Sequence, residues 1–196
     1  MSDYVPLPLH HLPLTVSYCR PTQDVPQYLK KSDEARLAMT DLRQVTAITI
    51  EPNASIDHAM LRMKEASIHM LLVTNPKNEV LGLITTTDIQ GEKPMQVVLN
   101  QGASRDDIMV RAIMTPRDHL EVMKMADVEK AYVGDIVETL IRSGRRHALV
   151  IDEHKDNQQE SIRGIFSQIQ LSQQLGEQIE SVEIAKTFAE VEKILG

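Results

Sequence analysis

The chain has 196 residues, of which 42% are hydrophobic and 25% are charged, and its formal net charge is −7. An acidic chain lacks the basic face that nucleic acids and anionic membranes require, and none of its apolar runs approaches the roughly 20 residues of a membrane span. Cys19 is the only cysteine, which excludes a disulfide framework and a cysteine zinc site and favours a reducing, cytoplasmic location.

The first part of the chain, residues 1–46, is predicted to be an extended N-terminal arm with one short helix. Prolines interrupt its beginning, which also lacks the charged and apolar regions of a signal peptide. The arm either lies on the body of the protein or is a loose terminus. Its short helix is predicted over residues 32–43 with Ser32 as N-cap, and a strand is predicted over residues 45–50.

Two segments of similar pattern follow. Apolar residues at helical spacing begin at Ile56, and the same stripe begins at Val133, which lies 77 residues later (133 − 56). Each stripe leads to a β-rich run, over residues 68–73 and 145–151, and then to a hydrophilic turn. These matching runs indicate an internal repeat.

The repeat predicts the fold. Each copy has the order β-α-β-β-α, and a three-stranded sheet with two helices leaves one apolar face uncovered, so the copies are expected to pack on each other. The predicted fold class is therefore α+β (mixed α/β), with repeats over residues 47–102 and 103–172 related by a pseudo-two-fold axis. Pro94 opens a short helix between them that ends at Gly102. An amphipathic helix is predicted over residues 173–196, where it caps the body or joins an oligomer interface.

The most informative motif ends the first repeat: Gly82-Leu83-Ile84-Thr85-Thr86-Thr87-Asp88. Thr85 and Asp88 stand three residues apart where a strand runs into a helix N-terminus, so they can face a phosphate and a diol together. The second repeat ends in Gly164-Ile165-Phe166-Ser167-Gln168-Ile169-Gln170, where Ser167 keeps the hydroxyl and Gln170 replaces the carboxylate. Two repeats with one complete motif favour a small-molecule sensor over an enzyme.

These residues resemble a tandem pair of CBS domains, the module named for cystathionine β-synthase, of the stand-alone bacterial type. The resemblance covers roughly residues 40–172. The stretch from Gly82 to Asp88 matches the family signature at every position. Ala112-Ile113-Met114-Thr115-Pro116 resembles the Met-Thr-Pro segment that often precedes a CBS repeat, and Ala38-Met39-Thr40 is a weaker version.

The resemblance implies a regulatory module that binds an adenosine-containing ligand between the repeats. It assigns the ribose hydroxyls to Asp88 and the α-phosphate to Thr85, and it completes this site from the opposite repeat. The implied ligand-binding residues are Thr85, Asp88, Thr87, Arg146, His147, Arg145, Leu120 and Met125. In the second, degenerate site Ser167 would face His69 and Met70, and Gln170 is expected to make that site weak, altered or vacant.

Structural interpretations remain open for several of these residues. Asp88 is also a favoured residue for capping a helix, and Thr86 and Thr87 are ordinary at a strand-to-helix junction. Arg145 and Arg146 fit a solvated edge strand equally, and His147 fits a structural hydrogen bond. The other histidines have no metal-ligand spacing, so no metal is assigned.

The sequence therefore predicts a regulatory sensor for AMP, ADP, ATP or S-adenosylmethionine, with no catalytic residues and no required cofactor. Magnesium could accompany a nucleotide. A homodimer is expected, with contacts from the helix faces at Ile56/Met60/Met63 and Val133/Val137/Leu140, together with a protein effector.

The alternative is an interaction or scaffold protein that keeps the CBS fold without a nucleotide. A small enzyme using the same cleft is a further alternative, although no phosphate loop or nucleophile motif supports it.

Overall fold

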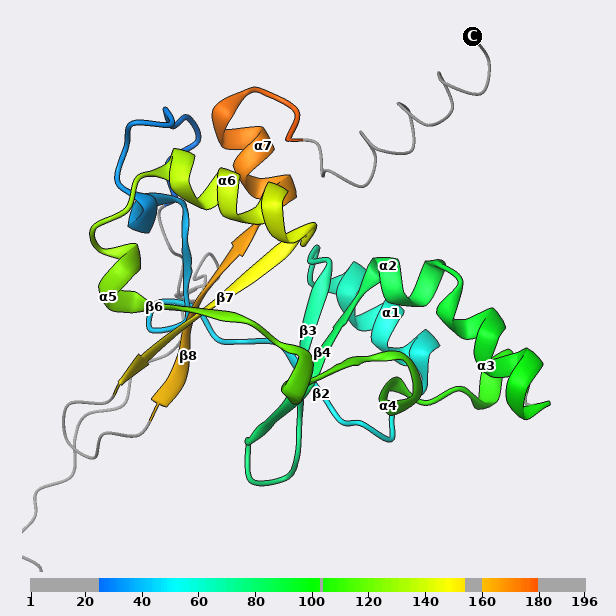
Figure 1. Cartoon of the computed structure of the whole chain (residues 1–196). Helices are drawn as coiled ribbons and strands as arrows, with labels where there is room; N and C mark the ends of the chain where they lie inside the picture. The colour runs from blue at the N-terminus through cyan, green and yellow to red at the C-terminus, as the bar shows by residue number, and fades with distance from the viewer. Residues whose placement is uncertain (1–24, 103, 154–159, 180–196) are drawn as a thin grey trace, which may run out of the picture.

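The computed structural model of the chain describes residues 25–102, 104–153 and 160–179. Most of the predicted N-terminal arm and of the predicted C-terminal helix, residues 1–24 and 180–196, lie outside the described residues. The described part contains two four-stranded sheets, each with helices on one of its faces (Figure 1). The predicted mixed α/β fold is confirmed.

The two repeats have the same order of elements. The first consists of β2 (Thr49–Ile50), α1 (Ile56–Glu65), β3 (Met70–Thr74), β4 (Val80–Thr85) and α2 (Thr86–Gln90). The second consists of β6 (Val122–Lys124), α6 (Val133–Ser143), β7 (His147–Glu153), β8 (Glu160–Ser167) and α7 (Gln168–Leu175). In each repeat the first strand is parallel to the second, and the second is antiparallel to the third. The predicted β-α-β-β-α order is confirmed in both copies.

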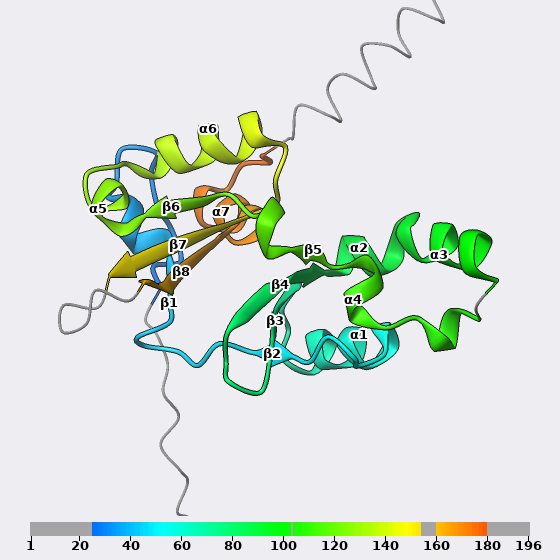
Figure 2. The same cartoon turned by 60° about the horizontal axis from the view of Figure 1, so that its bottom comes forward.

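The fourth strand of each sheet comes from the segment that leads into the other repeat. β5 (Thr115–Pro116) precedes the second repeat but pairs with β4 of the first, and β1 (Thr40–Asp41) precedes the first repeat but pairs with β8 of the second. Figure 2 shows β5 beside β4 and β1 beside β8. Residues 38–41 and 113–116, the lead-in segments, thus tie the two repeats together through main-chain hydrogen bonds.

Two glycines allow the lead-in segments to approach their sheets. Gly82 lies opposite Pro116, and Gly164 lies opposite Asp41. A Cβ atom at Gly82 would meet the main-chain oxygen of Thr115, and one at Gly164 would meet the side chain of Met39. The glycine of each repeat motif is therefore required by close packing of another segment.

The predicted helix over residues 32–43 is wrong. Only a 3-10 helix, η1 (Ala35–Ala38), forms there, with Glu34 rather than Ser32 at its N-cap. The chain leaves the helix because the next residues pair with β8, so main-chain hydrogen bonds to the sheet replace those of a longer helix. The predicted strand over residues 45–50 is likewise reduced to β2, and residues 42–48 form a linker between β1 and β2.

Each repeat has its own apolar core. The α1 stripe buries Ile56, Ala59 and Met63 against the first sheet, and the α6 stripe buries Val133, Val137 and Leu140 against the second. These side chains are covered within the chain, and Met60, the remaining residue of the predicted α1 contact, is partly buried, so their burial does not support the predicted homodimer contact at these faces. A third cluster, made by Met70, Leu72 and Leu149, joins the two repeats.

Shorter elements connect the repeats. The predicted helix at Pro94 is present as α3 (Lys93–Gln101), and Gly102 ends it with a φ of 63°. The remaining connecting elements are η2 (Arg105–Asp107), α4 (Val110–Ile113) and η3 (Arg117–His119), while α5 (Met125–Val128) lies within the second repeat, between β6 and α6. Within the described ranges, no helix has the length and apolarity needed to cross a membrane.

Candidate functional site

Thr85 and Asp88 meet at the junction between β4 and α2, as the motif predicts. Thr85 is the N-cap of α2, and its Oγ1 accepts a hydrogen bond of 3.2 Å from the main-chain N–H of Asp88. In return, Oδ2 of Asp88 accepts hydrogen bonds from the main-chain N–H and the hydroxyl of Thr85, at 2.8 and 2.7 Å. This is a complete capping box, so the structural role that the sequence left open for Asp88 is present.

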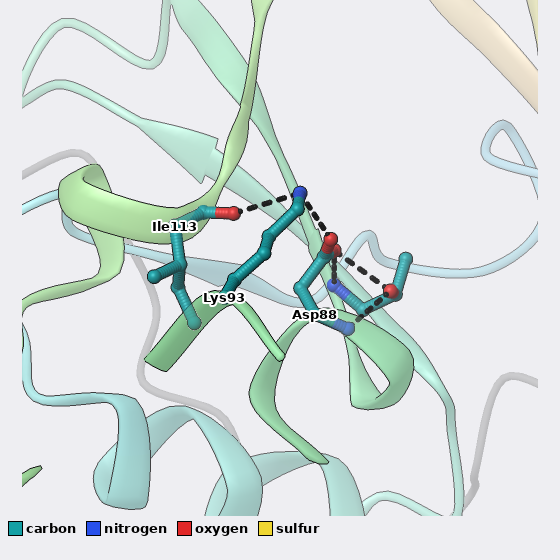
Figure 3. Close-up of polar contacts among 4 residues, drawn as sticks. Asp88, Lys93 and Ile113 are labelled. Carbon is teal, nitrogen blue, oxygen red and sulfur yellow. Dashed lines mark hydrogen bonds and ion pairs between the residues drawn. The ribbon is translucent and has the colours of Figure 1, made fainter. Parts of the chain in front are cut away.

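The second carboxylate oxygen of Asp88 binds a lysine. Nζ of Lys93, at the start of α3, lies 2.5 Å from Oδ1 of Asp88 and donates a second hydrogen bond of 3.1 Å to the main-chain oxygen of Ile113 (Figure 3). The Asp88 side chain is 12% exposed. Both of its oxygens therefore have partners within the chain, and Lys93 links α2 to the lead-in segment of the second repeat.

Arg145 and Arg146, the two residues before β7, reach different locations. Nη1 of Arg146 lies 3.3 Å from Oγ1 of Thr87, so Arg146 reaches the first repeat beside the capping box. Arg145 instead contacts the carboxylate of Glu121 and the main-chain oxygen of His119, both at 3.2 Å. The structure thus brings Thr85, Thr87, Asp88 and Arg146 together and places Arg145 with an acidic partner of its own repeat.

Leu120 and Met125, which the resemblance implies would flank the adenine ring from the opposite repeat, lie in packed clusters. Leu120 packs against the cluster that joins the repeats. Met125 is 5% exposed and lies in the core of the second repeat. The structure therefore gives no support to an adenine contact by Met125, because its side chain is enclosed by its own repeat.

The mirror junction between β8 and α7 is built differently. Ser167 is the N-cap of α7, but its side chain makes no capping hydrogen bond. Gln170 stands where Asp88 stands in the first repeat, and its side-chain amide donates to the main-chain oxygen of Ala38 at 3.2 Å. Its Oε1 accepts a hydrogen bond of 3.2 Å from the hydroxyl of Thr40. Gln170 therefore binds a lead-in segment directly.

The mirror junction opens into a cavity of about 460 Å³. Its walls come from both repeats and from the linker between β1 and β2. The lining residues are Thr40, Leu42, Val45, Thr46, Ala47, Ile48, Ser67, Ile68, His69, Met70, Leu72, His147, Ile165, Ser167, Ile169, Gln170 and Gln173. Ser167, His69 and Met70, the residues predicted for the degenerate site, all lie in this lining.

Sequence reasoning missed much of this cavity. It did not assign the linker residues Val45 and Ile48, or Gln173 of α7, to a site. The internal symmetry was the available signal. If the first strand of the second repeat flanks the Asp88 junction, the matching segment of the first repeat is expected to flank the Ser167 junction. His147, which the resemblance assigned to the Asp88 site, is also a lining residue of the cavity at the Ser167 junction.

His147 lies at the start of β7, opposite Ser167 of β8. Burial lowers the pKa of His147 to about 4, and repulsion from the neighbouring His69 and Arg146 adds to this effect, while Asp88 opposes it. The imidazole of His147 is therefore neutral at pH 7. No group of three or more His, Cys, Asp or Glu side chains able to hold a metal ion occurs in the part of the chain that the structure describes.

Comparisons with known proteins agree with the fold. Residues 39–92 match the family model of the CBS domain. An uncharacterized conserved protein from Pyrococcus horikoshii superposes with a TM-score of 0.51 at 22% identity, over 73% of this chain and 92% of that one. A CBS-domain containing protein from Agrobacterium tumefaciens gives a TM-score of 0.47 at 22% identity, over 64% and 81% of the two chains.

A third structure, CBSX2 in complex with AMP, gives a TM-score of 0.46 at 17% identity, over 71% of this chain and 92% of that one. The comparison with curated proteins found no match. At 22% identity the Pyrococcus horikoshii structure shows similarity of fold alone. Residues 39–92 are therefore the part of the chain that matches the CBS domain.

Proposed function

We propose that the chain is a regulatory module that binds an adenosine-containing ligand between its two repeats. The observation that carries this proposal is the cavity of about 460 Å³ whose walls come from both repeats. Its volume lies in the range of roughly 300–1,000 Å³ that is usual for small-molecule sites. The match of residues 39–92 to the CBS domain supports an adenosine-containing molecule as the ligand class.

The composition of the cavity also supports a nucleoside-like ligand. Apolar side chains such as Ile48, Met70 and Leu72 provide surfaces for a flat ring, and Ser167 and His69 supply hydrogen-bonding groups. A few polar groups among apolar walls are typical of sites that bind and orient small molecules.

A ligand in this position would act by shifting a population. It would contact the linker and β3 of the first repeat together with β8 and α7 of the second, so it would favour one relative pose of the repeats. The size of the response is limited by the difference in ligand affinity between the poses. We propose that a protein effector reads this pose.

The Asp88 junction is proposed as a second, conditional position for the same class of ligand. A ribose diol there would need an oxygen of Asp88 that Lys93 now holds at 2.5 Å. Because a carboxylate oxygen can accept a second hydrogen bond, AMP, ADP, ATP or S-adenosylmethionine, with magnesium for the longer phosphates, would bind there by sharing Oδ1 of Asp88 with Lys93. We further propose a homodimer that works in the cytoplasm and whose interface excludes the buried stripes of α1 and α6.

Calorimetric titration with AMP, ADP, ATP, S-adenosylmethionine and adenosine tests the proposal. Ala47→Trp places an indole in the cavity lining, and Val122→Trp is the matched control, because Val122 is 43% exposed on β6 and lies outside the lining. We expect at least one ligand to bind with a stoichiometry near one per chain, with the heat lost in Ala47→Trp and kept in Val122→Trp. Melting curves verify that each variant is folded.

The main alternative is an interaction protein that keeps the fold without a ligand. It is favoured by one observation: both oxygens of the Asp88 carboxylate already have partners within the chain. If folded protein gives no heat with any of the five ligands, the proposed function is wrong and this alternative takes its place.

A further inference from the structure

The cavity at the Ser167 junction has an uncharged lining. Its polar side chains are hydroxyl groups, side-chain amides and two imidazoles, contributed by Thr40, Thr46, Ser67, His69, His147, Ser167, Gln170 and Gln173. No aspartate, glutamate, lysine or arginine lines it among the residues that the structure describes. One quarter of the residues in the whole sequence are charged, so a lining of this size without any of them is a specific property of the site.

Three arginines of the second repeat hold partners outside the cavity lining. Arg146 donates to Thr87 at the other junction, and Arg145 pairs with Glu121. On the edge formed by β1 and β8, Arg163 is paired with Asp41. Each of these guanidinium groups is held in a contact that does not belong to the cavity lining.

One of the two imidazoles, that of His147, adds no positive charge to the lining. Its pKa is lowered to about 4 by burial, so it offers a neutral ring to a ligand at pH 7. Gln170, which replaces the aspartate of the other repeat, is also neutral, and its amide is held by Ala38 and Thr40. The site therefore offers neutral donors and acceptors in place of ion pairs.

We infer that the cavity selects an uncharged nucleoside over the corresponding 5′-phosphate. This inference rests on the proposed function and names the ligand class of the same site. A phosphate that enters the cavity would lose hydration without meeting a cation, and burying an unpaired charge is costly. An uncharged nucleoside carries hydroxyl and ring nitrogen groups that Ser167 and the neutral amides can satisfy without that cost.

Adenosine and AMP form the matched pair of probes, because they differ only by the phosphate. Titrations at pH 8 place the solution well above the ordinary histidine pKa of about 6.5. We expect adenosine to bind the full chain at least roughly tenfold more tightly than AMP, a difference of about 1.4 kcal/mol. Both signals should disappear in Ala47→Trp and persist in Val122→Trp.

A charge-insertion variant tests the reason for the preference. Gln173 is an exposed residue of α7 in the cavity lining, so Gln173→Lys adds a cation at the edge of the site. It should tighten AMP binding and reduce the preference for adenosine. Val122→Lys adds the same charge outside the lining and should leave the preference unchanged.

The outcomes separate the two proposals. AMP binding as tightly as adenosine, with both lost in Ala47→Trp, overturns the uncharged-ligand inference and leaves the proposed function standing. Binding that survives in Ala47→Trp but disappears in Asp88→Ala also overturns the inference, because the ligand would then occupy the other junction. No heat from either probe with folded protein overturns the proposed function itself.

Discussion

The side-chain amide of Gln170 donates a hydrogen bond of 3.2 Å to the main-chain oxygen of Ala38. The first repeat makes the matching connection in two steps, because Asp88 binds Lys93, and Lys93 donates to the main-chain oxygen of Ile113. Ala38 and Ile113 each precede the Met-Thr pair of a lead-in segment. A carboxylate cannot donate to a carbonyl oxygen, so the first repeat needs an ammonium group between them, whereas an amide needs none.

This relationship predicts that Gln170→Glu destabilises the protein. The new carboxylate would face the oxygen of Ala38 without a donor, in a partly buried site. We expect the free energy of unfolding to fall by about 1–3 kcal/mol at pH 7. Gln173→Glu, on the exposed side of the same helix, is the control and should change stability by less than about 0.5 kcal/mol. Urea denaturation measures both, and equal effects would contradict the assignment.

Asp88 and Lys93 should contribute unequally to stability. Asp88→Ala removes the capping box of α2 and is expected to cost about 1 kcal/mol. Lys93→Ala removes an ion pair in which the lysine side chain is 45% exposed, so solvent screening limits its cost to less than about 1 kcal/mol. Thermal unfolding of both variants checks the order, and a larger loss for Lys93→Ala would show that the link to Ile113 is the main interaction.

Substitution of the two motif glycines by alanine should lower the stability of the protein by different amounts. In Gly82→Ala the new Cβ meets the main-chain oxygen of Thr115, which cannot move without disturbing β5. In Gly164→Ala it meets the side chain of Met39, which can adjust. We expect Gly82→Ala to lower the free energy of unfolding by about 1–3 kcal/mol and Gly164→Ala to lower it by less. The opposite order in denaturant melts would refute this account of the lead-in segments.

The partly buried His147 predicts a loss of stability in mild acid. Its pKa is about 4 in the folded protein and about 6.5 in an unfolded chain, so the unfolded state takes up the proton first. The contribution of His147 to the free energy of unfolding is fully present above pH 6.5 and is lost as the pH falls towards 4. At pH 5 this loss is about 2 kcal/mol. His147→Asn should lose correspondingly less stability between pH 7 and 5. Melts of both proteins across this range measure the difference, and identical pH profiles would contradict the assignment.

The sequence predicted the repeated architecture because the signal is local. Apolar residues at helical spacing mark α1 and α6, and the matched offsets reveal the repeat without knowledge of any long-range contact. The junction of Thr85 with Asp88 was also predictable, because a capping box depends on residues three positions apart.

The errors concern contacts between distant segments. The helix predicted over residues 32–43 is replaced by strand β1 because β8, more than a hundred residues later, offers hydrogen-bond partners. The engagement of Asp88 by Lys93 and the cavity beside Ser167 likewise depend on how the repeats and the lead-in segments pack. The Asp signature indicated a site at one junction, and the cavity of about 460 Å³ at the other junction was not predicted in this extent.

The most direct test of the central claim is a crystal structure of the chain grown with saturating adenosine. The account predicts one nucleoside per chain between the repeats, in contact with Ser167 and with residues of the linker and β3 such as Ile48 and Met70. A nucleoside bound away from both junctions, or folded protein with no nucleoside between the repeats at saturating concentration, would contradict it.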